Sequence, residues 1–179
     1  MDKEELGQIN SYLTFKLGEE EFAANVSKVL SIMEMTKITK VPKSPEYMQG
    51  VINLRGQVLP VVDTRIKFGM SPTEFTQNTC IIVMEVDVEN EQVLVGALVD
   101  SVQEVLELND EDIQPPPSIG TNYKSEFISG MAKVDEKFIM ILDMDKVFSA
   151  KELEDVQTSV ERGKQEAASA DKETEVSDK

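Results

Sequence analysis

The sequence predicts a mainly β fold: two small closed barrels that share one core, with short helices and a helix near the C-terminus. Short apolar runs that alternate with polar residues, separated by turn-forming residues, recur along most of the chain. Two segments also repeat with glycine and aspartate at matching positions, which indicates a duplicated β unit. Each unit has only about 60–70 residues, so the units need a shared core, and closure into barrels removes exposed strand edges.

The first elements form a strand and a hairpin turn. Residues 12–17 (YLTFKL) alternate and are rich in β-forming residues, and the polar stretch GEEEF follows as a turn. In the next run, 22–35, the side chains of Val26, Val29 and Ile32 recur at every third residue. This spacing fits a helical turn as well as bulged strands, and both interpretations stay open.

Residues 40–50 (KVPKSPEYMQG) form a connection, because Pro42 and Pro45 interrupt any regular hydrogen-bond ladder. Ser44 is a suitable N-cap residue with proline at the first helical position, and Gly50 can end a helical turn. We therefore expect one short turn of helix within this connection.

The segment 51–63 predicts a hairpin that turns at Arg55-Gly56, where glycine supplies the positive φ of a tight turn. Pro60 cannot donate a hydrogen bond to a ladder, so it should lie at a sheet edge or a bulge. Asp63 ends the second strand and can cap a short helix in the following sequence TRIKF.

The second half of the chain repeats this plan. Residues 80–100 predict a hairpin with its polar turn at 89–91, and the sequence IQPPP then excludes helix and central strand. Residues 127–143 predict a third hairpin. A helix should follow over 144–156, with a capping-box pattern at 149–152.

The internal repeat is visible as two constant spacings. A spacing of 80 positions joins Gly50 to Gly130, Asp63 to Asp143 and Phe68 to Phe148. Upstream, a spacing of 73 positions joins Val26 to Val99 and Ile32 to Val105. The predicted organisation is an N-terminal arm (1–10), a double-barrel domain (11–149) with repeats at about 12–70 and 79–148, a C-terminal helix (150–162) and a disordered acidic tail (163–179).

The net charge argues against partners whose surfaces are negatively charged. At pH 7 the 179 residues carry a formal charge of -16, which repels nucleic-acid phosphates and anionic lipids. The N-terminal sequence MDKEELGQIN is acidic and unlike a signal peptide, and no apolar run is long enough to span a bilayer. We therefore expect a soluble cytoplasmic protein that binds no nucleic acid and does not insert into membranes.

Catalytic equipment is sparse. The chain has no histidine, and its single cysteine, Cys80, lies in a strand-like apolar run and reads as a small buried side chain. No nucleotide-binding, nucleophile-elbow or CxxC motif occurs. The remaining enzyme hypothesis is a carboxylate-based or metal-dependent site, which predicts acidic side chains converging in one pocket. A protein-binding module without cofactor is the stronger reading.

The assembled segments resemble the CheW-type chemotaxis coupling protein. The resemblance rests on EYMQGVINLRGQVLPVVDTRIKFG, VGALVDSVQEVL, IQPPP and FISGMAKVDEKFIMILDMDKVF, and it extends from about Tyr12 to Phe148. It implies two interlocked five-stranded SH3-like barrels. It also implies a non-catalytic adaptor that links the cytoplasmic signalling tips of chemoreceptors to the regulatory domain of a CheA-type histidine kinase in membrane-attached arrays.

The resemblance also implies a site. In this family the receptor tip docks in an apolar groove between the barrels, for which the candidates here are Leu13, Val26, Val29, Ile32 and Val99. Arg55, in the sequence NLRG, is the matching position for receptor coupling, and it can also brace its own loop against Asn53 or Glu46. Many members carry glutamate where this chain has Ser31.

Four other assignments are the alternatives to this one. The kinase's own regulatory domain and a CheV-type coupling protein resemble the same span, but they carry further catalytic or receiver domains, and the chain length favours the coupling protein. A coupling protein of a non-chemotactic system, such as surface motility, has the same sequence features. A paired-carboxylate enzyme is the alternative from a different class.

Overall fold

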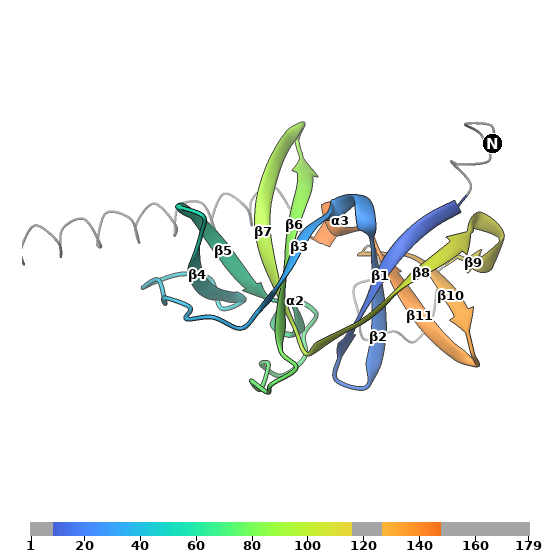
Figure 1. Cartoon of the computed structure of the whole chain (residues 1–179), viewed down its shortest axis with the longest axis horizontal. Coiled ribbons are helices and arrows are strands. Elements are labelled where there is room, and N and C mark those ends of the chain that lie inside the picture. Colours follow the sequence, from blue (N-terminus) through green and yellow to red (C-terminus); the bar gives the residue numbers. More distant parts are fainter. Residues whose placement is uncertain (1–8, 116–126, 148–179) are drawn as a thin grey trace, which may run out of the picture.

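The fold is seen in a computed structural model that describes residues 9–115 and 127–147 (Figure 1). Within this part of the chain the structure is mainly β, as predicted. The predicted C-terminal helix (150–162), its capping box and the tail (163–179) lie outside the described residues, as does most of the N-terminal arm.

The strands form two sheets. The first has the order β8-β1-β2-β11-β10-β9, with bounds Ser101–Asn109, Ile9–Leu17, Glu20–Asn25, Lys137–Leu142, Ile128–Val134 and Ile113–Gln114. The second has the order β3-β6-β7-β5-β4, with bounds Val29–Glu34, Cys80–Val88, Glu91–Val99, Gln57–Asp63 and Met48–Leu54. Within residues 9–115 and 127–147, four short helical turns accompany the strands: η1 (Val26–Lys28), α2 (Thr64–Lys67), η2 (Asp110–Asp112) and α3 (Met144–Val147).

The two repeats exchange hairpins, which is what interlocks the barrels. The β6–β7 hairpin of the second repeat lies in the sheet of β3, β4 and β5, and the β1–β2 hairpin of the first repeat lies in the other sheet. In each sheet the repeats meet in one parallel pair, β5 with β7 or β11 with β2, and in one antiparallel pair, β3 with β6 or β1 with β8 (Figure 1). One sheet has six strands rather than five because β9, only two residues long, pairs with β10. The first repeat has an isolated bridge between Thr39 and Val51 at that place.

The spacing of 80 positions is preserved in backbone hydrogen bonds. Asp63 N donates to the carbonyl oxygen of Tyr47 at 2.7 Å, and Asp143 N donates to that of Phe127 at 2.9 Å. The hairpins β4–β5 and β10–β11 also shift register at the same point of the repeat. The internal duplication seen in the sequence is therefore a duplication of structure.

Three hairpins turn through two residues with positive φ. These pairs are Arg55-Gly56, Glu89-Asn90 and Asp135-Glu136. Two consecutive left-handed residues match the right-handed twist of the flanking strands, so such turns favour short hairpins. The predicted turn at Arg55-Gly56 is confirmed, and the predicted turn at 89–91 is one residue shorter because Glu91 begins β7.

The predicted helical turn within 40–50 is wrong. Met48 N donates to the carbonyl oxygen of Pro45 in a tight turn, and β4 begins at once at Met48. Gly50 lies inside β4 at a register shift with φ +151, and a Cβ there would collide with the carbonyl oxygen of Thr39. Gly50 is thus required for a close backbone approach and not for a helix end.

Two further expectations are resolved by the strands. The run 22–35 contains both a helical turn and strands, because the turn η1 separates β2 from β3. Pro60 lies in an interior strand, but β5 pairs with β7 only from Val61 to Asp63, so no ladder hydrogen bond is lost at the proline.

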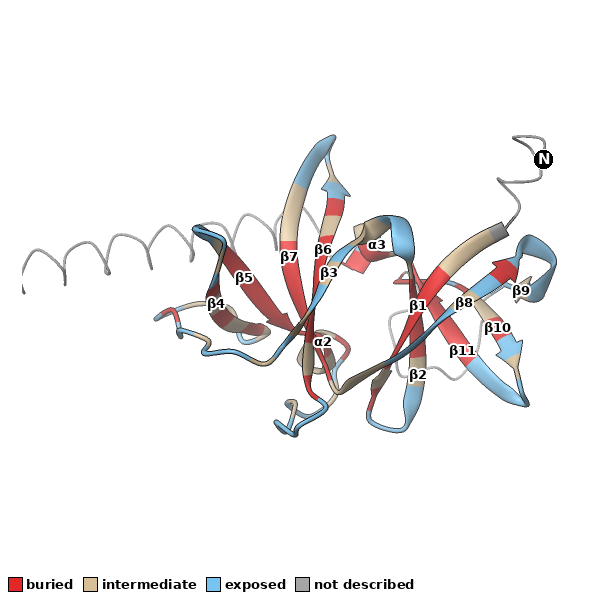
Figure 2. Cartoon of the chain, in the orientation of Figure 1, coloured by how far each residue is buried: buried red, intermediate tan, exposed pale blue. Residues whose placement is uncertain are grey.

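One core is shared by both sheets (Figure 2). Four phenylalanines form a continuous row through it, with ring centroids 6.0 Å apart for Phe15 and Phe22, 5.6 Å for Phe22 and Phe68, and 5.9 Å for Phe68 and Phe127. These rings come from β1, β2, the end of α2 and the start of β10. The hairpin exchange therefore lets two small units bury one common apolar interior.

Candidate functional site

An exposed apolar stretch lies at the turn η1 and along β3. Asn25 caps η1, since its Oδ1 accepts a hydrogen bond from Ser27 N at 2.9 Å. The strand β3 then alternates between half-buried and exposed side chains. It lies at one end of its sheet, paired with β6. Residues from here are therefore presented on a sheet edge.

The exposed apolar side chains of this stretch are Val26, Leu30 and Ile32, which we call the β3 patch. Leu30 exposes 54% of its surface and Ile32 exposes 47%. Their positions two residues apart on a strand place both side chains on the same face. Apolar side chains gathered on a strand edge are typical of a protein-binding surface.

The second repeat has a similar feature on β8. Val105 lies 73 positions after Ile32 and is also exposed. The strand β8 is the corresponding end strand of the other sheet, where it pairs with β1. The duplication therefore places an exposed β-branched residue on both end strands.

Two of the predicted groove residues do not lie on a surface. Leu13 is only 4% exposed and Val99 is 0% exposed, and both pack in the shared core. Both residues lie on interior strands, since β1 is between β8 and β2 and β7 is between β6 and β5, and their side chains pack in the core. Val29 is half-buried against the same core, so Val26 and Ile32 remain as the exposed members of the predicted set.

Arg55 is exposed at the tip of the β4–β5 hairpin. The predicted brace of Arg55 against Asn53 or Glu46 is not formed, and Asn53 instead holds the backbone of the turn: its Oδ1 accepts a hydrogen bond from Gly56 N at 2.8 Å. Among the residues that the structure describes, none forms a hydrogen bond or ion pair with the Arg55 guanidinium. Its five donors are therefore available to a partner.

Sequence reasoning missed Leu30 and Val105. Leu30 lies two residues before Ile32. If the run is interpreted as a strand, this spacing places both side chains on the same face. The spacing of 73 positions already joined Val105 to Ile32, and only its exposure was unknown.

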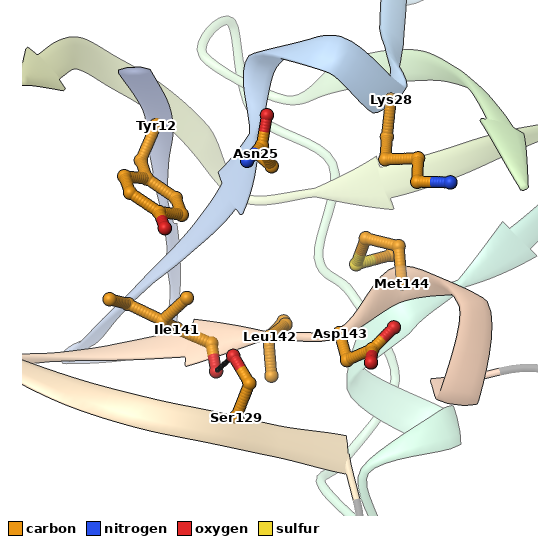
Figure 3. Close-up of a pocket in the computed structure, with 8 residues that line it drawn as sticks. All are labelled: Tyr12, Asn25, Lys28, Ser129, Ile141, Leu142, Asp143 and Met144. Carbon is orange, nitrogen blue, oxygen red and sulfur yellow. Dashed lines mark hydrogen bonds between the residues drawn. The ribbon is translucent and has the colours of Figure 1, made fainter. Parts of the chain in front are cut away.

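A separate cleft of about 170 Å³ lies where the parallel strands β2 and β11 end (Figure 3). It is lined by Tyr12, Asn25, Lys28, Ser129, Ile141, Leu142, Asp143 and Met144. Ser129 Oγ donates to the carbonyl oxygen of Ile141 at 3.2 Å across its floor. Asp143 is the one carboxylate in this lining, so the cleft offers no pair of acids for acid–base chemistry.

Two groups of this cleft have shifted titration. Burial, and then the negative charge of Asp110, raise the pKa of the Tyr12 hydroxyl above its ordinary value. Hydrogen bonding to Asp145 raises the pKa of Lys28 even though burial opposes it. Both groups keep their protons at neutral pH. Within the described ranges, no group of three or more His, Cys, Asp or Glu side chains is arranged to hold a metal ion.

The described part of the chain contains no helix that is long and apolar enough to cross a membrane.

The amino-acid sequence matches a known protein family and several of its members. Residues 11–152 match the family model described as the CheW-like domain. A probable chemotaxis protein CheW of Rhizobium etli is 39% identical over 142 residues, covering 79% of this chain and 89% of that protein. The chemotaxis protein CheW of Klebsiella aerogenes is 33% identical over 150 residues, covering 84% and 87%.

A solved structure supports the fold. The chain resembles the crystal structure of the scaffolding protein TtCheW from Thermoanaerobacter tengcongensis with a TM-score of 0.70 and 31% identity. The match covers 80% of this chain and 90% of that chain.

Proposed function

This chain belongs to the CheW-like domain family, and on that premise we propose that it is a non-catalytic scaffold coupling chemoreceptor signalling tips to a CheA-type histidine kinase. The relatives are named chemotaxis proteins, and the solved relative is named a scaffolding protein. The function needs no cofactor. It places the protein in the cytoplasm, recruited to membrane-attached receptor arrays through its partners.

The observation that carries the proposal is the β3 patch. Val26, Leu30 and Ile32 are apolar side chains on a strand edge with no cover from the described residues. Burying the exposed half of one such side chain against a partner contributes about 1–1.5 kcal/mol, roughly half the value for a fully exposed side chain. The patch is therefore the part of the predicted site that can contact a receptor tip directly.

Arg55 adds a charged contact to this proposal. Its hairpin tip is fixed by the Asn53 to Gly56 hydrogen bond, so the exposed guanidinium is presented on a rigid base. Such a group can donate to carbonyl or carboxylate oxygens of a partner helix. Leu13 and Val99 support the site from the core, and Val29 packs behind the patch.

The first test replaces Ile32 by Asp and measures co-sedimentation with a receptor signalling fragment and the cognate kinase. Losing the buried side chain and introducing a charge should together weaken binding roughly 10- to 100-fold. The matched control is Phe75→Asp, because Phe75 is equally exposed and lies outside the patch. A folded Ile32→Asp protein with wild-type binding would remove β3 from the proposed site.

A second test replaces Arg55 by Glu and measures kinase autophosphorylation in the ternary complex. We expect weaker coupling with an unchanged fold, because the Arg55 side chain is exposed and forms no hydrogen bond or ion pair within the described residues. Unfolded protein would assign Arg55 a structural role instead. Unchanged kinase activation would show that the charge at this tip is dispensable.

A further inference from the structure

Two ion-pair clamps join the exchanged hairpins to the short helices. In the first clamp, Arg65 Nη1 of α2 lies 3.0 Å from Asp100 Oδ2, in the crossover between β7 and β8. The same oxygen accepts a hydrogen bond from Gly18 N at 2.6 Å, at the end of β1. Both charged side chains are largely buried. This clamp links α2, the crossover and the hairpin of the other sheet.

The second clamp has the same three parts. Lys28 Nζ, in the crossover between β2 and β3, lies 2.9 Å from Asp145 Oδ2 of α3. Asp145 Oδ1 accepts a hydrogen bond from Asp87 N at 2.8 Å, near the end of β6. Lys28 also lies 3.1 Å from the Asp87 carboxylate. Helix, crossover and exchanged hairpin are again held together.

The strand registers show that the clamps are equivalent. Val61 of β5 pairs with Gly96 of β7, and Ile141 of β11 pairs with Ala23 of β2. These pairs preserve the spacings of 80 and 73 positions, so the helix residues of the two clamps correspond. The crossover residues differ by one position, since the counterpart of Asp100 is Ser27, next to Lys28.

The polarity of the two clamps is opposite. In the first, the helix supplies the cation and the crossover the carboxylate, whereas in the second the helix supplies the carboxylate and the crossover the cation. In both clamps a backbone N–H of the exchanged hairpin binds the carboxylate, whichever part carries it. The contact geometry is thus conserved while the charges are reversed.

This reversal has a consequence for chain pairing. If each repeat closed on its own hairpin, β5 would lie beside β2 and β11 beside β7. Arg65 would then face Lys28, and Asp145 would face Asp100. Both contacts would join like charges in a partly buried setting, where they are destabilising. The repulsion between Asp145 and Asp100 would be uncompensated, whereas Asp87, which ion-pairs with Lys28, would offset part of the repulsion between Arg65 and Lys28.

We propose that the opposite polarity of the two clamps selects the interlocked arrangement over self-closed repeats. Corresponding positions of the two hairpins, such as Phe22 and Val95, are both apolar and buried, so the hydrophobic pattern of the strands does not by itself specify which hairpin lies beside β5. The charges supply the discrimination. Each helix accepts only the crossover that comes from the other repeat.

The test reverses the charges within a clamp while keeping its two partners opposite in charge. The double variant Arg65→Asp/Asp100→Arg gives the first clamp the polarity of the second, so that native and self-closed arrangements both pair opposite charges. The quadruple variant adds Lys28→Asp and Asp145→Lys, which makes the polarities opposite again. Each full-length variant is unfolded, refolded at high dilution to prevent exchange between chains, and examined by NMR.

The readout is the strand beside β5. A backbone contact between Val61 and Gly96 reports the interlocked arrangement, and one between Val61 and Ala23 reports the self-closed arrangement. We expect the wild type and the quadruple variant to show only the first. The double variant should add a second set of signals with the Val61–Ala23 contact, with the ratio of the two arrangements changed about tenfold.

Two results would overturn the proposal. One is a double variant that refolds entirely to the Val61–Gly96 pairing. The other is a quadruple variant as heterogeneous as the double variant, because lost local contacts and not clamp polarity would then cause the heterogeneity.

Discussion

At the scale of single residues, one aspartate has two different environments in the two repeats. Asp63 is buried at the start of α2, and its carboxylate accepts hydrogen bonds from Arg65 N, Ile66 N, Thr73 N and Thr73 Oγ1. Its counterpart Asp143 is half-buried and accepts from Asp145 N within the described residues. The same residue therefore caps a helix in both repeats and also anchors a loop in the first.

This difference predicts unequal costs of substitution. Asp63→Ala should lower the free energy of unfolding by roughly 2–4 kcal/mol, because it removes a cap and leaves the Thr73 groups without an acceptor. Asp143→Ala should cost about 1 kcal/mol, the value of a cap alone. Urea unfolding of both variants measures the difference. Equal losses would contradict the anchoring role of Asp63.

The shifted groups Tyr12 and Lys28 predict alkaline sensitivity. Their pKa values lie above the ordinary values of 10.0 and 10.5, so both groups lose protons more readily in the unfolded chain. As the pH rises above about 10, the unfolded chain releases these protons first, so the folded state loses stability until the pH passes the folded pKa values. Tyr12→Phe should therefore flatten the fall in stability above pH 10 while leaving stability at pH 7 little changed.

The matched measurement is urea unfolding of the wild type and Tyr12→Phe at neutral and alkaline pH. If both proteins lose stability equally above pH 10, titration of Tyr12 is not part of the alkaline fall.

At the scale of elements, the hairpin β4–β5 depends on a close backbone contact. A Cβ at Gly50 would meet the carbonyl oxygen of Thr39. Thr39 and Val51 exchange two backbone hydrogen bonds, from Thr39 N at 2.9 Å and from Val51 N at 2.8 Å. By contrast, a Cβ at Gly56 would meet nothing within 4 Å. Both glycines have positive φ, +86 at Gly56 and +151 at Gly50, and Gly50 combines a φ that other residues avoid more strongly with a collision that Gly56 lacks.

We expect Gly50→Ala to lower the free energy of unfolding by roughly 2–4 kcal/mol, because strain and displacement of the bridge add together. Gly56→Ala should cost about 1 kcal/mol, from the positive φ alone. Chemical denaturation of the two variants gives the comparison. A Gly50→Ala protein as stable as Gly56→Ala would show that the Thr39 bridge yields without cost.

The elements that sequence patterns predict well are those fixed by local chemistry. The turn at Arg55-Gly56 and the cap at Asp63 depend on neighbouring residues, and both are confirmed. The helical turn expected at 44–50 does not form. The local capping pattern there competes with a distant contact, the bridge from Thr39 to Val51, and the bridge is formed instead. Such a contact has no local signature.

At the scale of the whole molecule, the repeat predicted both the duplication and the shared core. The candidate surface was harder to predict, because Leu13, Val29 and Ile32 have similar apolar character in the sequence. Their burial is set by the hairpin exchange and by the register shift between Val29 and Ser31. As a result, Leu13 is buried, Val29 is half-buried and Ile32 is exposed.

The most direct test of the coupling account is NMR of the isotope-labelled chain titrated with a receptor signalling fragment. We predict that the amide shifts change mainly from Val26 to Glu34 and at the Arg55 tip, and that Ile32→Asp abolishes these changes. Shift changes confined to other exposed apolar residues, such as Phe75 and Phe138, would contradict the proposed receptor surface.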